Sequence, residues 1–287
     1  MASQRLGLAL AVALLLSGGA AGQEVAHFPS LDAQQTMLDG YLLRPAGGGR
    51  HSALVFLHGC GGLFGRATGR ILSRESDWGA RFTAAGYVVM MVDSFGPRRH
   101  GEMCSRRGFD NGLYQLRPKD AYGALAYLQA QDFVRPDRIG AIGWSEGGGV
   151  ILYAIGMPSL GRPAGLPPER DFRAAVAFYP ASCRDDRQAA NWTTAVPLLV
   201  LNGDADVWTP AAPCHSLLSA AAARGAPVSQ QIYPGAYHDF DFPDLARTER
   251  PEFATSAGVV PITGTDPLAR ADALQRVPGF LARYLAP

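Results

Sequence analysis

A serine flanked by glycines stands directly after a short apolar run, in the segment AIGWSEGGGVILY at residues 141–153. The pattern G-x-S-x-G places Ser145 two residues after Gly143 and two residues before Gly147. In a strained strand-to-helix turn this spacing lifts the serine hydroxyl above the edge of a sheet, and a Cβ at either glycine would collide with neighbouring backbone. Ser145 is therefore a candidate nucleophile. The alternative is that the glycines only allow a helix to pack tightly against a sheet.

A serine nucleophile needs a general base, and the base needs a carboxylate to orient it. With this kind of turn the groups follow along the chain as Ser, then Asp or Glu, then His. Asp204 and Asp206 follow an apolar run in LLVLNGDADVWTP, and His238 stands in IYPGAYHDFD after the next run. The other histidine in this part of the chain, His215, falls in an expected helix. His238 is thus the candidate base, with an exposed loop residue as the alternative, and Asp204 could instead cap a turn.

Attack on a carbonyl also requires backbone N–H groups that stabilise the developing oxyanion. The N–H of Glu146, the residue after the serine, is one candidate. The segment HGCGG resembles the oxyanion loop of lipases and esterases, which makes the N–H of Cys60 the second candidate and that of Gly61 the alternative. His58 is then interpreted as a packing or hydrogen-bonding residue of this loop and not as a base.

Four segments, LHGCGG, GWSEGG, GDADVWTP and YHDF, together resemble the dienelactone hydrolase family of α/β-hydrolases. The resemblance covers nearly all of the chain after residue 22 and implies that Asp206 is the orienting acid. Dienelactone hydrolases proper resemble this pattern but have cysteine as the nucleophile, whereas position 145 here is serine. This departure favours a general ester or lactone hydrolase over a dienelactone hydrolase proper. A peptidase or polyester hydrolase of the same fold, or a catalytically silent binding module, are the alternatives.

The elements that must position these residues alternate between short apolar strands and helices. This alternation predicts βαβ units, and hence an α/β fold of the α/β-hydrolase kind with a mostly parallel sheet covered by helices on both faces. Residues 94–120 and 156–171 are expected to be largely loop. Strands are expected at residues 36–47, 52–59, 87–93, 138–144, 174–180, 197–203 and 228–235, and helices at 74–86, 119–131, directly after Ser145, 210–225 and 266–285.

The chain has 287 residues with 26 basic and 25 acidic side chains, so no broad field attracts nucleic acid or an anionic membrane. Arg5 and the apolar stretch that follows it predict a secretory signal peptide over residues 1–22, with a retained membrane anchor as the alternative. Residues 23–287 are then a single domain, secreted or periplasmic. Export favours disulfides, and Cys183–Cys214 is the preferred pair because both cysteines follow adjacent predicted strands. No metal-binding or nucleotide-binding motif is present in the sequence, so no metal or cofactor is expected.

Residues 94–120 hold several arginines that could clamp a substrate carboxylate, with a solvated surface loop as the alternative. Arg98 is the preferred candidate. Three aromatic residues flank the catalytic motifs and could line a pocket or fill the core. The arginines are Arg98, Arg99, Arg106, Arg107 and Arg117, and the aromatic residues are Phe64, Trp144 and Trp208.

Overall fold

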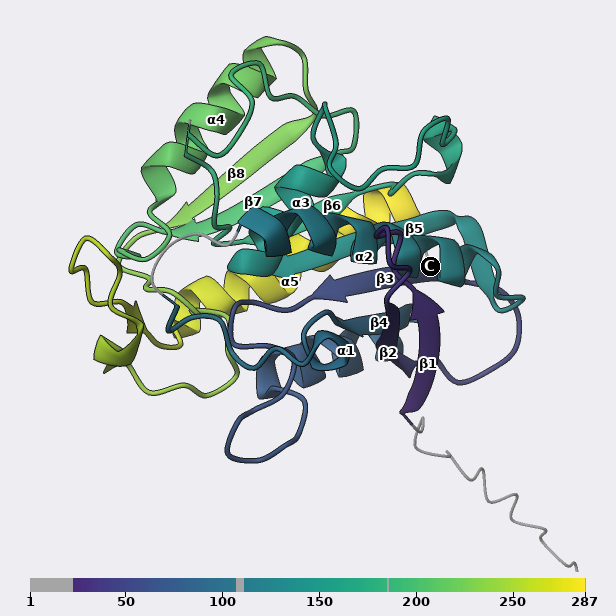
Figure 1. Cartoon of the computed structure of the whole chain (residues 1–287), viewed down its shortest axis with the longest axis horizontal. Coiled ribbons are helices and arrows are strands. Elements are labelled where there is room, and N and C mark those ends of the chain that lie inside the picture. The colour runs from purple at the N-terminus through teal and green to yellow at the C-terminus, as the bar shows by residue number, and fades with distance from the viewer. Residues whose placement is uncertain (1–22, 107–110, 185, 287) are drawn as a thin grey trace, which may run out of the picture.

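One sheet of eight strands forms the centre of the computed structural model, which describes residues 23–106, 111–184 and 186–286. The spatial order is β1-β2-β4-β3-β5-β6-β7-β8, and β2 pairs antiparallel with both of its neighbours while the other pairs are parallel. The strands are β1 (Glu24–Pro29), β2 (Met37–Leu43), β3 (His51–Leu57), β4 (Val88–Asp93), β5 (Val134–Trp144), β6 (Ala175–Phe178), β7 (Leu198–Gly203) and β8 (Val228–Tyr233). The predicted α/β-hydrolase sheet, mostly parallel, is thereby confirmed (Figure 1).

Helices cover both faces of this sheet. Side chains of α2, α3 and α4 pack on one face, and side chains of α1 and α5 pack on the other. The helices are α1 (Ser73–Ala84), α2 (Asn111–Gln129), α3 (Glu146–Ile155), α4 (Ala211–Ala223) and α5 (Pro267–Leu285). The 3₁₀ turns η1 (Gly96–Arg98), η2 (Pro168–Arg170) and η3 (Pro251–Phe253) and a small ladder of β9 (Thr248–Glu249) with β10 (Ile262–Thr263) lie in the connections.

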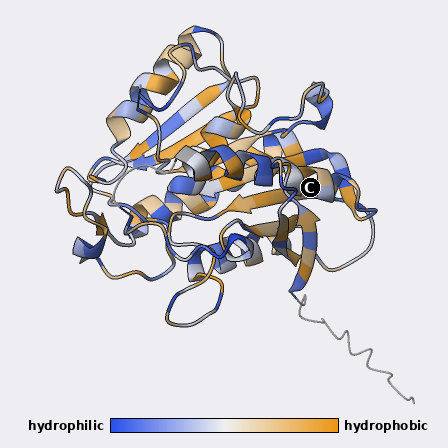
Figure 2. Cartoon of the chain, in the orientation of Figure 1, coloured by the Kyte–Doolittle hydropathy of each residue, from blue (hydrophilic) through white to orange (hydrophobic). Residues whose placement is uncertain are grey.

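The central strands are apolar on both faces because helices cover both. In β3, Ala53, Val55 and Leu57 face α2 and α3, whereas Leu54 and Phe56 face α1 and α5. Figure 2 shows these central strands as predominantly hydrophobic, while the edge strand β8 has three consecutive polar residues, Ser229, Gln230 and Gln231. Continuous burial explains why these runs are strongly apolar in the sequence.

Two elements differ from the sequence-based expectation. β1 was not predicted; its six residues alternate only weakly, and their pairing with β2 supplies the stabilisation. α2 begins at Asn111, within the segment expected to be loop, and runs through Pro118. Leu113 and Arg117 become buried in this extra part of the helix. The burial compensates for the backbone hydrogen bond that Pro118 removes.

The signal-peptide prediction for residues 1–22 lies outside the described residues. Within the described part, no helix is long and apolar enough to span a bilayer.

Candidate active site

Ser145 lies in the turn between β5 and α3, in a conformation that few side chains adopt. Its φ is 52° and its ψ is −114°. A Cβ on Gly147 would lie 2.0 Å from the carbonyl oxygen of Leu57, and a Cβ on Gly143 would lie 2.3 Å from that of Gly147. The prediction that both positions exclude a side chain is confirmed. Strain of this kind is concentrated at functional sites, where the surrounding structure imposes it.

The loop after β8 brings His238 to Asp206, which follows β7. The two side chains are joined by a hydrogen bond of 2.7 Å between His238 Nδ1 and Asp206 Oδ2, and both are almost completely buried. Burial alone would raise the pKa of Asp206, but the His238 charge and the hydrogen bonds from His238 and Thr209 lower it below its usual value. Burial likewise opposes protonation of His238, but Asp206 prevails and raises the pKa of the imidazole. Asp206 is therefore placed to orient and charge-stabilise the ring.

Asp204 has a different role from Asp206. It is exposed, and its Oδ1 accepts a 2.6 Å hydrogen bond from the N–H of Gly235 in the turn after β8. Of the two aspartates left open by the sequence, the structure brings only Asp206 to His238.

A buried polar cluster anchors the chain directly after His238, and sequence reasoning missed it. Arg74 donates to Asp239 at 2.9 Å and to the hydroxyl of Tyr179 at 3.1 Å. The Tyr179 hydroxyl donates to Asp241 at 2.5 Å, and the Tyr179 ring lies 4.4 Å from the His238 ring. Two acidic residues directly after the histidine, in HDFD, were the available signal. Their partner Arg74 is far away in the chain.

The two segments predicted to supply oxyanion donors lie beside Ser145. Glu146 is the first residue of α3, where backbone N–H groups have no partner within the helix. A Cβ on Gly59 would lie 3.4 Å from Ser145 Cβ, so the loop that carries Cys60 passes next to this serine. Buried Arg117 connects the two segments: it donates to Glu146 Oε1 and to the carbonyl oxygen of His58, both at 2.6 Å. Arg117 thus holds the Cys60 loop and the start of α3 together, and its side chain is not exposed to a substrate.

His58 is buried and both of its ring nitrogens are occupied. Nδ1 donates to the carbonyl oxygen of Gly59 at 2.7 Å, and Nε2 accepts from the N–H of Ser94 at 3.3 Å. Burial and the nearby Arg117 charge keep the pKa of His58 well below its usual value. These contacts agree with its interpretation as a packing residue of the loop.

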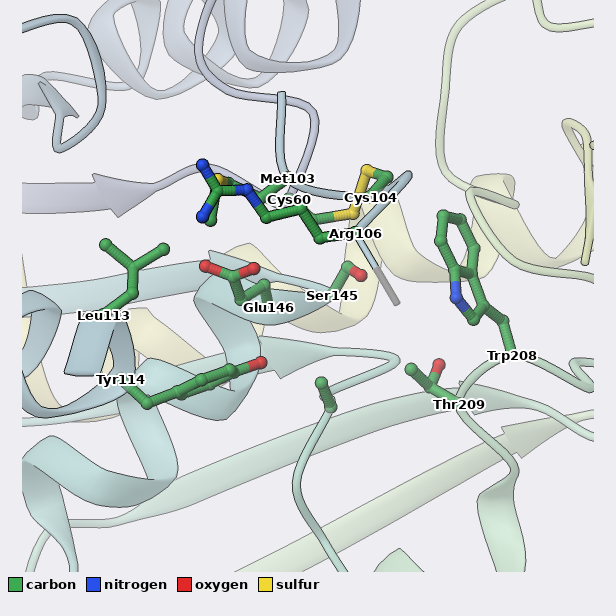
Figure 3. A pocket seen from close by; sticks show the side chains of 11 residues that line it. Cys60, Met103, Cys104, Arg106, Leu113, Tyr114, Ser145, Glu146, Trp208 and Thr209 are labelled. Carbon is green, nitrogen blue, oxygen red and sulfur yellow. A yellow bond between two sulfur atoms is a disulfide. The ribbon is translucent and has the colours of Figure 1, made fainter. Parts of the chain in front are cut away.

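Two cavities meet at Ser145. The smaller cavity has a volume of about 180 Å³ and is lined by Cys60, Met103, Cys104, Arg106, Leu113, Tyr114, Ser145, Glu146, Ala181, Trp208 and Thr209 (Figure 3). The larger cavity has a volume of about 540 Å³, and its lining includes Ser145, Trp208, His238, Phe64, Arg74, Phe242, Arg250 and Phe253. Phe64 and Trp208 therefore line the candidate site, as expected for substrate-contacting residues.

Other substrate-binding expectations are wrong. The Arg98 guanidinium is bound by Asp120 at 2.7 and 2.8 Å and by Asp32 at 2.8 Å, so it cannot clamp a substrate carboxylate. Trp144 is fully buried in the core, where its indole N–H donates to Asp241 at 2.8 Å.

The remaining arginines of residues 94–120 occupy different surroundings. Arg99 is exposed in a turn with φ 57°, and Arg106 lines the smaller cavity. Arg107 lies outside the described residues.

The preferred disulfide Cys183–Cys214 is present, and Cys60 is joined to Cys104. The second bond ties the loop after β3 to the segment that follows η1, directly over the two cavities. Among the described residues, no group of three or more His, Cys, Asp or Glu is arranged to hold a metal ion.

Comparison with known proteins places this site in a wider group. The model of the dienelactone hydrolase family matches residues 38–285. Esterase 2 of Thermogutta terrifontis, solved phosphoramylated by tabun, superposes with a TM-score of 0.63 at 21% identity, covering 93% of this chain and 97% of that one. This likeness shows a shared fold.

Two curated proteins are similar over part of their length. A Bradyrhizobium protein described as a probable 2-oxo-3-(5-oxofuran-2-ylidene)propanoate lactonase is 26% identical over 172 residues, which are 58% of this chain and 64% of that protein. Mouse dipeptidyl peptidase 8 is 27% identical over 187 residues, which are 55% of this chain and 20% of the peptidase. The chain thus spans less than two thirds of the length of either protein.

Proposed function

The chain belongs to the dienelactone hydrolase family, and from this premise we propose that it is a carboxylic ester hydrolase with a serine nucleophile. The observation that carries the proposal is the meeting of Ser145 and His238 at the larger cavity, with Asp206 bonded to the far nitrogen of His238. Esters and lactones are the substrate classes, because both present a carbonyl carbon to the serine.

In the proposed reaction His238 accepts the Ser145 proton through Nε2 while the serine oxygen bonds to the carbonyl carbon. Asp206 keeps the other ring proton on Nδ1 and stabilises the imidazolium that forms. The N–H groups of Cys60 and Glu146 bind the oxyanion. Removing a single donor of this kind costs about 10²- to 10³-fold in kcat. His238 then protonates the leaving alcohol, and water hydrolyses the acyl-enzyme by the same route in reverse.

The first experiment compares wild type with Ser145→Ala on p-nitrophenyl acetate and p-nitrophenyl butyrate. We expect hydrolysis by wild type and a loss of about 10³-fold or more in the variant, since the residual rate comes from binding and the oxyanion hole alone. Equal rates for both proteins would refute a serine nucleophile at position 145.

A peptidase is the second candidate function, and the local similarity to dipeptidyl peptidase 8 favours it. Dipeptidyl p-nitroanilides tested beside p-nitrophenyl esters of the same acyl groups separate the two. Hydrolysis of the esters alone supports the ester hydrolase; efficient cleavage of the anilides would transfer the proposal to peptide bonds.

We also propose that the protein is exported after removal of residues 1–22. The apolar leader-like sequence supports this, as do two disulfides in a chain of this size, because such bonds persist in oxidising compartments. N-terminal sequencing of protein recovered from culture medium or periplasm should start at Gln23. A start at Met1 or Ala2 would contradict cleavage.

A further inference from the structure

Ser145 lies between two cavities of unequal size, and only a few residues line both of them. Both cavities are lined by Ser145, Trp208 and the bonded pair Cys60–Cys104. In Figure 3, Leu113, Tyr114 and Glu146 lie to one side of Ser145, Trp208 and Thr209 lie to the other, and the disulfide lies above. The disulfide and the indole therefore form the boundary at which a substrate passes from one cavity to the other.

His238 distinguishes the two cavities, because it lines the larger and not the smaller one. The leaving alcohol must take its proton from this histidine, so the alcohol part of an ester must depart on the histidine side. Three other bonds of the tetrahedral carbon go to the serine oxygen, the oxyanion and the acyl chain. Since the oxyanion is directed to the backbone donors, the acyl chain is left with the smaller cavity.

Resting on the proposed ester hydrolysis, we propose that this site takes esters with a compact acyl group and a bulky alcohol group. The smaller cavity of about 180 Å³ is close in size to a buried cavity of about 150 Å³ that accepts benzene. It fits an acyl group of benzoyl size or smaller. The larger cavity has three times this volume and aromatic walls from Phe64, Phe242 and Phe253.

The charges around the larger cavity favour a neutral alcohol group in the substrate. In the larger cavity the lining arginines are matched by as many acidic residues; the arginines are Arg66, Arg74 and Arg250, and the acids are Glu102, Asp239 and Glu252. Arg74 and Arg250 already form ion pairs with Asp239 and Glu252. The described residues that line the larger cavity therefore offer no excess of positive charge to a carboxylate on the alcohol group.

Two isomeric esters with similar leaving groups test the assignment of the acyl group to the smaller cavity and of the alcohol group to the larger one. In 2-naphthylmethyl acetate the naphthyl group is on the alcohol side, and in methyl 2-naphthylacetate it is on the acyl side. The leaving groups, 2-naphthylmethanol and methanol, are both alkyl alcohols that His238 protonates as they depart. We expect kcat/KM for the first ester to exceed that for the second by about 100-fold, the discrimination that one ill-fitting group produces in an apolar pocket. Equal values within about threefold, or the reverse order, would overturn the assignment.

Leu113→Ala provides a second, independent test, since Leu113 lines only the smaller cavity. Removing its side chain should lower the ratio of the two kcat/KM values by about tenfold by admitting the naphthylacetyl group. Phe253→Ala is the matched control, because Phe253 lines only the larger cavity. Phe253→Ala should lower kcat/KM for 2-naphthylmethyl acetate without raising kcat/KM for methyl 2-naphthylacetate. The opposite pattern for the two variants would place the acyl group in the larger cavity and the alcohol group in the smaller one, and would refute the proposal.

The measurements also separate this inference from the proposed function. If p-nitrophenyl acetate is hydrolysed but the isomeric esters show the wrong preference, only the assignment of the cavities fails. If no ester is hydrolysed, ester hydrolysis itself fails, and the assignment fails with it.

Discussion

Asp206→Asn is expected to reverse the tautomer of His238. Asp206 Oδ1 accepts hydrogen bonds from the backbone N–H groups of Trp208 at 2.8 Å and Thr209 at 2.9 Å, so the amide oxygen of the variant must keep this position. The amide nitrogen then replaces Oδ2, 2.7 Å from His238 Nδ1, and becomes a donor. The ring proton is displaced to Nε2, the nitrogen that accepts the proton of Ser145 in the proposed reaction.

The expected loss follows from this reversal. A Ser-His-Asp triad held in the wrong tautomer loses about 10⁴-fold in kcat, which corresponds to about 5 kcal/mol of transition-state stabilisation. The fold should be preserved, because the two backbone hydrogen bonds remain. The Thr209 hydroxyl, which donates to Oδ2 at 2.7 Å, can turn to accept from the amide.

The assay is the hydrolysis of p-nitrophenyl acetate by wild type, Asp206→Asn and Asp204→Asn, with thermal unfolding of each protein as the check on folding. Asp204→Asn is the matched control: its carboxylate bonds Gly235 in an exposed turn, so kcat should stay within about threefold of wild type. The reasoning would be refuted if Asp206→Asn kept more than about a tenth of the activity, or if Asp204→Asn lost as much.

Three further outcomes follow from the site. Because neighbouring Asp206 raises the pKa of His238, kcat/KM should fall with decreasing pH through a pKa above the ordinary value of about 6.5; a rate that stays level through this range would exclude His238 as base. Reducing Cys60–Cys104 should lower kcat by about tenfold, since it frees the loop expected to carry an oxyanion donor. Full activity after reduction verified by mass spectrometry would contradict this, and the other disulfide, removed by alanine substitution, serves as control. Arg117→Met should reduce kcat by about 10-fold or more with little change in KM, because Glu146 loses its buried partner; a change confined to KM would indicate a substrate contact instead.

Much of the sheet was predictable because its strands are buried on both faces and therefore read as continuous apolar runs. The candidate triad was predictable for a related reason. Parallel strands end at one edge of the sheet, so residues directly after β5, β7 and β8 must come close together, and Ser145, Asp206 and His238 follow these three strands.

The remaining features depend on contacts between segments far apart in the chain. Arg98 reads as a loop arginine, but the folded chain supplies Asp32 and Asp120, and their two carboxylates bind its guanidinium. Arg74 reads as an ordinary helix residue, yet it reaches Asp239 across 165 positions. No local pattern distinguishes a buried, paired arginine from a solvated one, because the difference lies entirely in the partners.

The most direct test of the account is to identify the atom that becomes acylated or phosphorylated. The whole protein is treated with diisopropyl fluorophosphate, digested, and mapped by tandem mass spectrometry, with Ser145→Ala in parallel. The account predicts a single stoichiometric adduct on Ser145, complete loss of esterase activity in step with labelling, and no adduct in the variant. Inactivation accompanied by an adduct at any other residue, or unchanged labelling of Ser145→Ala, would contradict it.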